Sequence, residues 1–166
     1  KKIRIIDFGS SIIVKRRNMY YNYIQTRWYC SPDVILGKPI TIHIDIWSLG
    51  CIIYELYTRN VLFKGKKSCN LSRKFQLHRI IGVLGIPSES YLSDCLMRAR
   101  YFIYKRTLIP KDNNYNLIKE INDKGEEIIL EKRNLDDEVT NPSILKLIKE
   151  MLKYDQRLSI EMLKSL

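Results

Sequence analysis

Long hydrophobic runs, a signal peptide and an initiating methionine are all missing from this chain of 166 residues. Its most apolar stretch, residues 44–58, is shorter than the roughly 20 residues that a transmembrane helix needs. Two lysines open the chain, and a strand-like run follows them directly, without the regions of a secretory signal. We therefore expect no membrane segment. The missing methionine is compatible with a start inside a longer protein.

Metal-binding and disulfide patterns are lacking as well. The sequence has only two histidines, and its four cysteines are too widely spaced to form a Cys-x-x-Cys pair: Cys30, Cys51, Cys69 and Cys95. This spacing argues against a zinc site. Reduced thiols are typical of proteins inside the cell. We expect an intracellular protein, in the cytoplasm or the nucleus.

Basic residues outnumber acidic ones by 29 to 18, which gives a net charge of +11. One interpretation is a nucleic-acid or acidic partner. The other is a solvated, lysine-rich surface, since Lys, Asn, Ile and Tyr are abundant together, as an A/T-biased coding sequence would produce. Apart from residues 15–17 and 64–67, the basic residues are spread along the chain. We favour the solvated surface and rank a nucleic-acid module last.

The stretch from Ile44 to Thr58 is apolar on nearly every face, which predicts a buried central helix. Gly50 lies inside it, at a cost of roughly 1 kcal/mol relative to alanine. The expected benefit is the close approach of a neighbouring backbone. Asp45 lies in the first turn, where a carboxylate suits the helix dipole. A carboxylate on a buried helix also needs a partner.

The remaining pattern predicts one mainly α domain over residues 1–166. Ile3–Ile6 is typical of a short strand, and residues 32–36 of a helical turn that ends at Gly37. Residues 115–121 and 127–130 flank a turn-forming sequence, which indicates a β-hairpin. Asn141 followed by proline predicts the start of the C-terminal helices at 142–166.

Three motifs at these separations resemble a eukaryotic protein kinase. They are Asp-Phe-Gly at residues 7–9, Ser-Pro-Asp at 31–33 and Asp-x-Trp-Ser-x-Gly from Asp45 through Trp47 to Gly50. The run from Tyr21 to Arg27 is similar to the dual-specificity tyrosine-regulated kinases of the CMGC group. The resemblance implies the C-terminal lobe of a kinase without its N-terminal lobe. Its parts would be an activation segment at 7–33, the central helix at 44–58 and a CMGC-type insert at about 88–140.

The resemblance implies a role for several residues of the activation segment. Asp7 would bind the magnesium that bridges the ATP phosphates, and Thr26 would support substrate positioning. Tyr23 would be the tyrosine that the kinase phosphorylates on itself, with Arg27 as a ligand of its phosphate. A second arginine of the family is replaced here by Cys30, which carries no fixed positive charge.

Two structural carboxylates also follow from the resemblance. Asp33 stands where the family has a glutamate that pairs with a late arginine, and Arg157 is its best match here. Asp45 would accept hydrogen bonds from the backbone of the catalytic loop. The Gly-rich loop, the ATP-binding lysine and the His-Arg-Asp catalytic loop are not found in the sequence.

The first hypothesis is therefore a partial kinase domain. Its full-length parent would use ATP and Mg²⁺ to phosphorylate Ser and Thr of protein substrates. This chain alone would be inactive, would bind neither ATP nor Mg²⁺ tightly, and would depend on an N-terminal lobe supplied elsewhere. The alternative is a catalytically dead remnant that acts as a protein-binding module, which the changes at Cys30 and Asp33 suggest.

Overall fold

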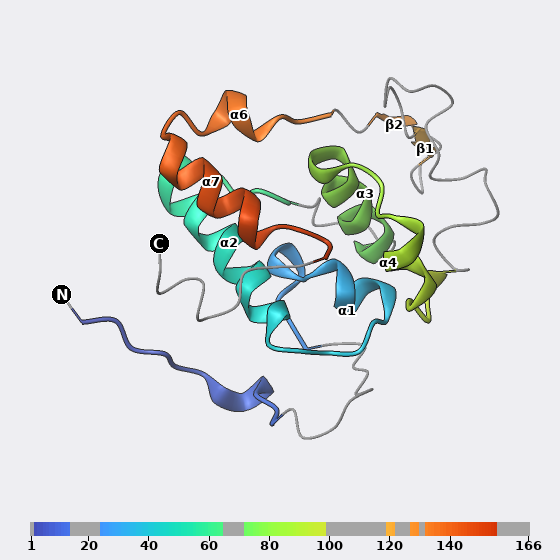
Figure 1. Cartoon of the computed structure of the whole chain (residues 1–166), viewed down its shortest axis with the longest axis horizontal. Helices are drawn as coiled ribbons and strands as arrows, with labels where there is room; N and C mark the ends of the chain where they lie inside the picture. The colour runs from blue at the N-terminus through green and yellow to red at the C-terminus, as the bar shows by residue number, and fades with distance from the viewer. Residues whose placement is uncertain are drawn as a thin grey trace.

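The computed structural model describes residues 2–13, 24–64, 72–98, 119–121, 127–129 and 132–155. Within these ranges the predicted mainly α fold is confirmed. The helices are arranged around α2 (His43–Thr58), and α7 (Pro142–Met151) lies along it (Figure 1). To the right of α2 in that view lie α1 (Pro32–Leu36), α3 (Ser72–Leu84) and α4 (Glu89–Ser93). No helix in the described ranges is long and apolar enough to cross a bilayer.

The contact between α2 and α7 depends on Gly50. A Cβ atom added at Gly50 would lie 2.9 Å from Cβ of Met151 and 3.1 Å from Cδ2 of Leu152. Beside it on α2, Trp47 is fully buried and stacks on Phe63, with ring centroids 5.6 Å apart. A close approach at Gly50 is therefore present, but it is made by side chains and not by the neighbouring backbone that the sequence analysis expects.

The central helix is not buried on every side, contrary to the sequence-based expectation. Leu49, Ile52 and Leu56 are 41%, 42% and 77% exposed, and they follow Asp45 at helical spacing along one face. Asp45 is itself exposed, so the expectation of a buried carboxylate is wrong. The apolar face reaches water because the described segments pack only against the opposite side of the helix.

Three helix starts follow directly from local sequence, because a side-chain oxygen satisfies backbone amides that have no intrahelical partner. The hydroxyl of Ser31 accepts from the Val34 amide at the start of α1. Ser88 does the same for the Tyr91 amide at the start of α4. The amide oxygen of Asn141 accepts from the amides of Ser143 and Ile144. The helix start expected at Asn141 is confirmed.

The two predicted strand regions have opposite outcomes. Residues 119–121 (β1, Lys119–Ile121) and 127–129 (β2, Glu127–Ile129) pair antiparallel, with Glu120 opposite Ile128, so the strand pairing of the predicted hairpin is confirmed. Its turn and its outer residues lie outside the described residues. The strand predicted at Ile3–Ile6 does not form. Ile3 is 96% exposed, and this segment pairs with no other described strand. A strand needs a neighbouring strand to satisfy its backbone hydrogen bonds, so the β-branched run alone does not form one.

Replacing Gly50 by alanine should destabilise the fold. The gain in helix propensity is about 1 kcal/mol, but overpacking against α7 costs about 1–3 kcal/mol. We expect a net loss of about 1 kcal/mol, measured by urea unfolding, because the two terms partly cancel. Leu56→Ala, at an exposed position of the same helix, should change the unfolding free energy by less than about 0.5 kcal/mol. Unchanged or increased stability of Gly50→Ala would contradict the close packing.

Candidate functional site

The segment that precedes α1 contains Thr26, Arg27 and Cys30, three of the residues singled out by the sequence. Its centre is a short 3-10 helix, η2 (Arg27–Tyr29), preceded by Thr26 and followed by Cys30. Thr26 and Arg27 are exposed, whereas Cys30 is 8% exposed and Ser31 is fully buried. The segment thus has an outer side that carries Thr26 and Arg27 and an inner side that contacts the helices.

The inner side is attached to α2 by polar side chains that sequence reasoning did not identify. Gln25 donates hydrogen bonds to the carbonyl of Ile44 and to the hydroxyl of Ser48, both at 2.7 Å. Its side-chain oxygen accepts from the amide of Ser31 at 3.0 Å. Ser48 in turn donates to the carbonyl of Tyr29 at 3.0 Å. The signal in the sequence was weak, because Gln25 lies in an irregular stretch and Ser48 was read only as part of a motif.

Tyr29 adds a side-chain link between the same segment and α2. Its hydroxyl donates to the carboxylate of Glu55 at 2.6 Å. This hydrogen bond, together with burial, raises the pKa of Tyr29 to about 12, since ionisation would place two negative charges side by side. The phenol therefore remains protonated at physiological pH and keeps its bond to Glu55.

Cys30 occupies the position where the family resemblance implied a second arginine. Burial raises the pKa of its thiol to about 12. Its Sγ atom lies 3.7 Å from the carbonyl of Ser31. A neutral, buried thiol offers no positive charge to a phosphate. Arg27 is exposed close by, while Tyr23, the expected phosphorylation site, lies outside the described residues.

Asp33 is buried and accepts a hydrogen bond from the hydroxyl of Tyr91 on α4 at 2.6 Å. The ammonium group of Lys38 lies 3.9 Å from the centre of the Tyr91 ring. Asp33 therefore connects α1 to α4 through a tyrosine that sequence reasoning did not identify as its partner. Arg157, its expected partner, lies outside the described residues.

Asp7 lies far along the chain from these contacts, in the exposed N-terminal segment. Its backbone is left-handed, with φ at 60°, and it directly precedes the 3-10 helix η1 (Phe8–Ser10). Among the described residues no group of three or more His, Cys, Asp or Glu side chains could hold a metal ion. Mg²⁺ in nucleotide sites relies on carboxylates together with substrate phosphates. Asp7 provides one such carboxylate, so the described residues do not by themselves fit an ATP–magnesium complex.

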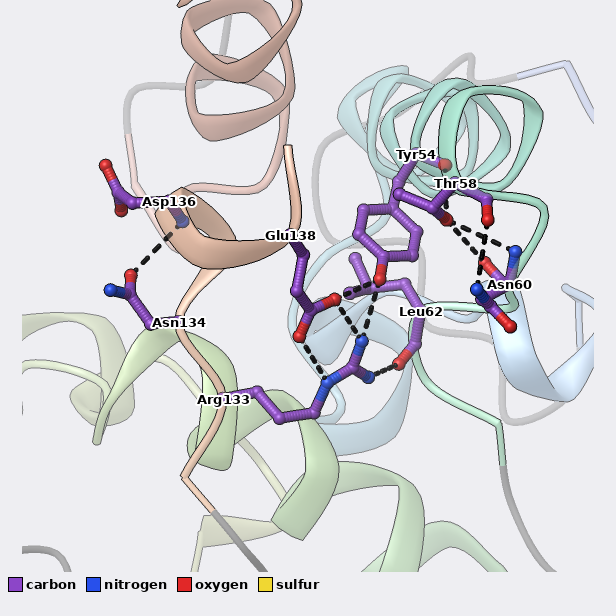
Figure 2. A network of polar contacts seen from close by, with 8 residues as sticks. All are labelled: Tyr54, Thr58, Asn60, Leu62, Arg133, Asn134, Asp136 and Glu138. Atoms are coloured by element: carbon purple, nitrogen blue, oxygen red, sulfur yellow. Dashed lines mark hydrogen bonds and ion pairs between the residues drawn. The ribbon is translucent and has the colours of Figure 1, made fainter. Parts of the chain in front are cut away.

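A second polar cluster joins the end of α2 to α6 (Leu135–Glu138) (Figure 2). The guanidinium of Arg133 donates twice to Glu138, at 2.9 and 2.5 Å, and also bonds the carbonyl of Leu62 and the hydroxyl of Tyr54. Tyr54 also donates to Glu138. Hydrogen bonding to Arg133 lowers the pKa of the Glu138 carboxyl and hydrogen bonding to Glu138 raises the pKa of Arg133. The sequence offered no signal for this cluster, since Tyr54 and Arg133 are 79 residues apart.

Comparison with known proteins places these features in context. A family model of the protein kinase domain matches residues 1–165. The human dual specificity tyrosine-phosphorylation-regulated kinase 4 (Homo sapiens) is 43% identical over 100 residues, which cover 60% of this chain and 18% of that protein. Dual specificity tyrosine-phosphorylation-regulated kinase 2 of Drosophila melanogaster is 46% identical over 100 residues, or 60% of this chain and 13% of that protein.

A third relative comes from fission yeast. The DYRK-family kinase pom1 of Schizosaccharomyces pombe (strain 972 / ATCC 24843) is 41% identical over 101 residues, which cover 61% of this chain and 9% of that protein. The alignments thus span less than a fifth of the length of each of these three relatives.

The thiols of Cys30 and Cys95 should react very slowly in the folded chain. Burial raises the pKa of both thiols to about 12, so at pH 8 the reactive thiolate is about 1,000-fold scarcer than for an ordinary cysteine. Iodoacetamide labelling, followed by mass spectrometry of the peptides, measures this. Both cysteines should label rapidly in denaturant, and rapid labelling of either one without denaturant would contradict the burial.

The ion pair of Glu138 should make stability depend on pH. Because its pKa is lowered in the folded state, its contribution is present above the unfolded pKa of roughly 4.3 and is lost as pH falls through the folded pKa. Urea unfolding of Glu138→Gln should therefore show a deficit of about 1–2 kcal/mol at pH 7 that shrinks toward pH 3. Asp137→Asn, at an exposed position of α6, is the matched control. A deficit that does not vary with pH would exclude the ion pair as its cause.

Proposed function

Because this chain belongs to the protein kinase domain family, we propose that it forms the substrate-side part of a kinase's C-terminal lobe. The parent protein would transfer the γ-phosphate of ATP to Ser and Thr hydroxyls of proteins and would phosphorylate its own Tyr23. The observation that carries this proposal is the attachment of the segment at residues 25–31 to α2, since a loop that presents Thr26 and Arg27 outward is suited to receive a peptide.

We assign a distinct role to each candidate site residue of this chain. Asp7 would offer its carboxylate to the magnesium ion, which offsets the charge of the ATP phosphates when bound. Thr26 would hold the peptide near the reacting group, and Arg27 would bind the phosphate of modified Tyr23. Asp33, Trp47 and Gly50 hold the helices that carry this segment. Asp45 is exposed at the start of α2, open to a partner outside the described residues.

The chain by itself is proposed to be inactive. Phosphoryl transfer depends on several groups positioned together, and among the described residues Asp7 is the carboxylate to which we assign the metal. An N-terminal lobe would have to act with it, and the exposed apolar side chains of α2 are compatible with further protein covering that face. Free buried thiols at Cys30, Cys51 and Cys95 favour a reducing compartment, the cytoplasm or the nucleus.

A catalytically dead binding module is the second candidate, and Cys30 favours it. Loss of a guanidinium at this position removes a strong phosphate ligand, so phosphorylation of Tyr23 would order the loop less. A remnant under relaxed constraint would tolerate such a change.

An activity measurement on the longest transcript product that contains this chain separates the two candidates. We expect phosphate transfer to Ser and Thr peptides, and a fall of about 100-fold or more in kcat for Asp7→Asn because the metal loses a charged ligand. Asp137→Asn should have wild-type activity. Purified residues 1–166 should show no transfer and no micromolar affinity for ATP–Mg²⁺. An inactive parent that still binds other proteins would overturn the kinase proposal in favour of the binding module.

A further inference from the structure

The backbone passes from half-buried Tyr29 to buried Cys30 and Ser31, and its polar groups need partners there. Ser31 is fully buried, with a relative exposure of 0%. An unpaired amide or carbonyl in such a place costs about 1–3 kcal/mol. The two groups concerned are the amide of Ser31 and the carbonyl of Tyr29, and neither is satisfied by a helix.

Both groups are satisfied by a closed set of side-chain contacts. The amide of Ser31 donates to Gln25 Oε1, and the two hydrogens of Gln25 Nε2 go to Ile44 O and Ser48 Oγ. The hydroxyl hydrogen of Ser48 goes to Tyr29 O at 3.0 Å, the shorter of its two contacts, the other being Ile44 O at 3.3 Å. The amide of Ser31 and the carbonyl of Tyr29 therefore both have a partner.

These hydrogen bonds restrict which side chain can occupy position 25. The side chain must accept from one side and donate twice on the other, which a primary amide does and neither a carboxylate nor a hydroxyl can do. Rotating the amide by half a turn would place Nε2 against the donating amide of Ser31. Asparagine offers the same groups but is shorter by one methylene.

We propose that Gln25 is a positioning residue that clamps the loop at residues 26–31 onto α2 in the unphosphorylated chain. We name this set of contacts, among Gln25, Tyr29, Ser31, Ile44 and Ser48, the glutamine clamp. It acts through neutral hydrogen bonds, so it needs neither a phosphate on Tyr23 nor the arginine that Cys30 replaces. The statement that this loop faces a peptide rests on the proposed function, whereas the clamp itself is a property of the folded chain.

Other contacts on the same loop provide a matched comparison. Tyr29 bonds Glu55 through its side chain at 2.6 Å and leaves the backbone groups untouched. Gln76 of α3 donates to the carbonyl of Trp28 at 3.3 Å, a longer contact on the other side of the loop. Removing the Tyr29 hydroxyl therefore breaks a link between the same two elements without opening the glutamine clamp.

Hydrogen exchange of the Ser31 amide in the unphosphorylated 166-residue chain tests the proposal. We expect slow exchange in the wild type and exchange at least about tenfold faster in Gln25→Leu, because the buried acceptor is lost. Tyr29→Phe should accelerate Ser31 by less than about threefold. Ser48→Ala, which removes the link to the Tyr29 carbonyl, should give an intermediate acceleration. Amides in α7, such as that of Ile148, report whether each variant is folded.

Three outcomes would overturn the clamp. One is wild-type exchange of Ser31 as fast as in an unfolded peptide. Another is equal acceleration by Gln25→Leu and Tyr29→Phe. The third is a Ser31 exchange rate that stays at the wild-type value both in Ser48→Ala and in a folded Gln25→Leu variant. If Gln25→Leu does not fold, the comparison of Ser48→Ala with Tyr29→Phe decides.

Steady-state kinetics of the longer parent provide a separate readout of positioning. Gln25→Leu should raise the peptide KM at least about threefold and leave the ATP KM unchanged, because only the peptide side of the site is displaced. An unchanged peptide KM in an active parent would overturn the positioning role. A parent without activity would instead count against the proposed function, while the exchange of Ser31 would still decide on the clamp.

Discussion

The close contact of α2 with α7 at Gly50 is the packing on which the other features depend. An added Cβ there would lie within 3.1 Å of both Met151 and Leu152, so the two helices can approach only because the side chain is absent. The same approach helps to enclose Trp47, which stacks on Phe63. Once α2 is held in this way, it provides a rigid surface to which irregular segments attach.

Irregular segments attach to this helix through polar contacts as well as apolar ones. The loop at residues 26–31 is tied by the glutamine clamp and by the bond from Tyr29 to Glu55. At the far end of α2, Arg133 connects Tyr54, Leu62 and Glu138. Hydrogen bonds have directional requirements that hydrophobic contacts lack, so they define the position of segments that have no repeating structure of their own.

The side of α2 that carries Asp45, Leu49, Ile52 and Leu56 is different, because no described segment covers it. A helix with apolar residues all round is suited to burial on both sides, and here one side is buried by α7 and the helices near it. Asp45 lies on the side that no described segment covers, and the expectation that it would be buried was therefore wrong.

Local sequence determined the elements that are stabilised by hydrogen bonds between residues close in the chain. The cap at Asn141 and the pairing of residues 119–121 with 127–129 formed as predicted, because their hydrogen bonds join residues close in the chain. Family motifs also pointed to the segment around Thr26 and Arg27. The strand at Ile3–Ile6 failed because a strand takes its stability from a neighbour that periodicity cannot supply.

The tertiary structure alone decided which side chains hold the site together. Gln25 and Ser48 are 23 residues apart, Asp33 and Tyr91 are 58 apart, and Tyr54 and Arg133 are 79 apart. No period or motif connects such pairs, since their partnership arises only when packed helices bring buried donors and acceptors within bonding distance. The sequence by itself determined the family, the helices at residues 32–36 and 44–58, and the start of α7 at Asn141. The folded chain determined which polar groups satisfy one another inside it.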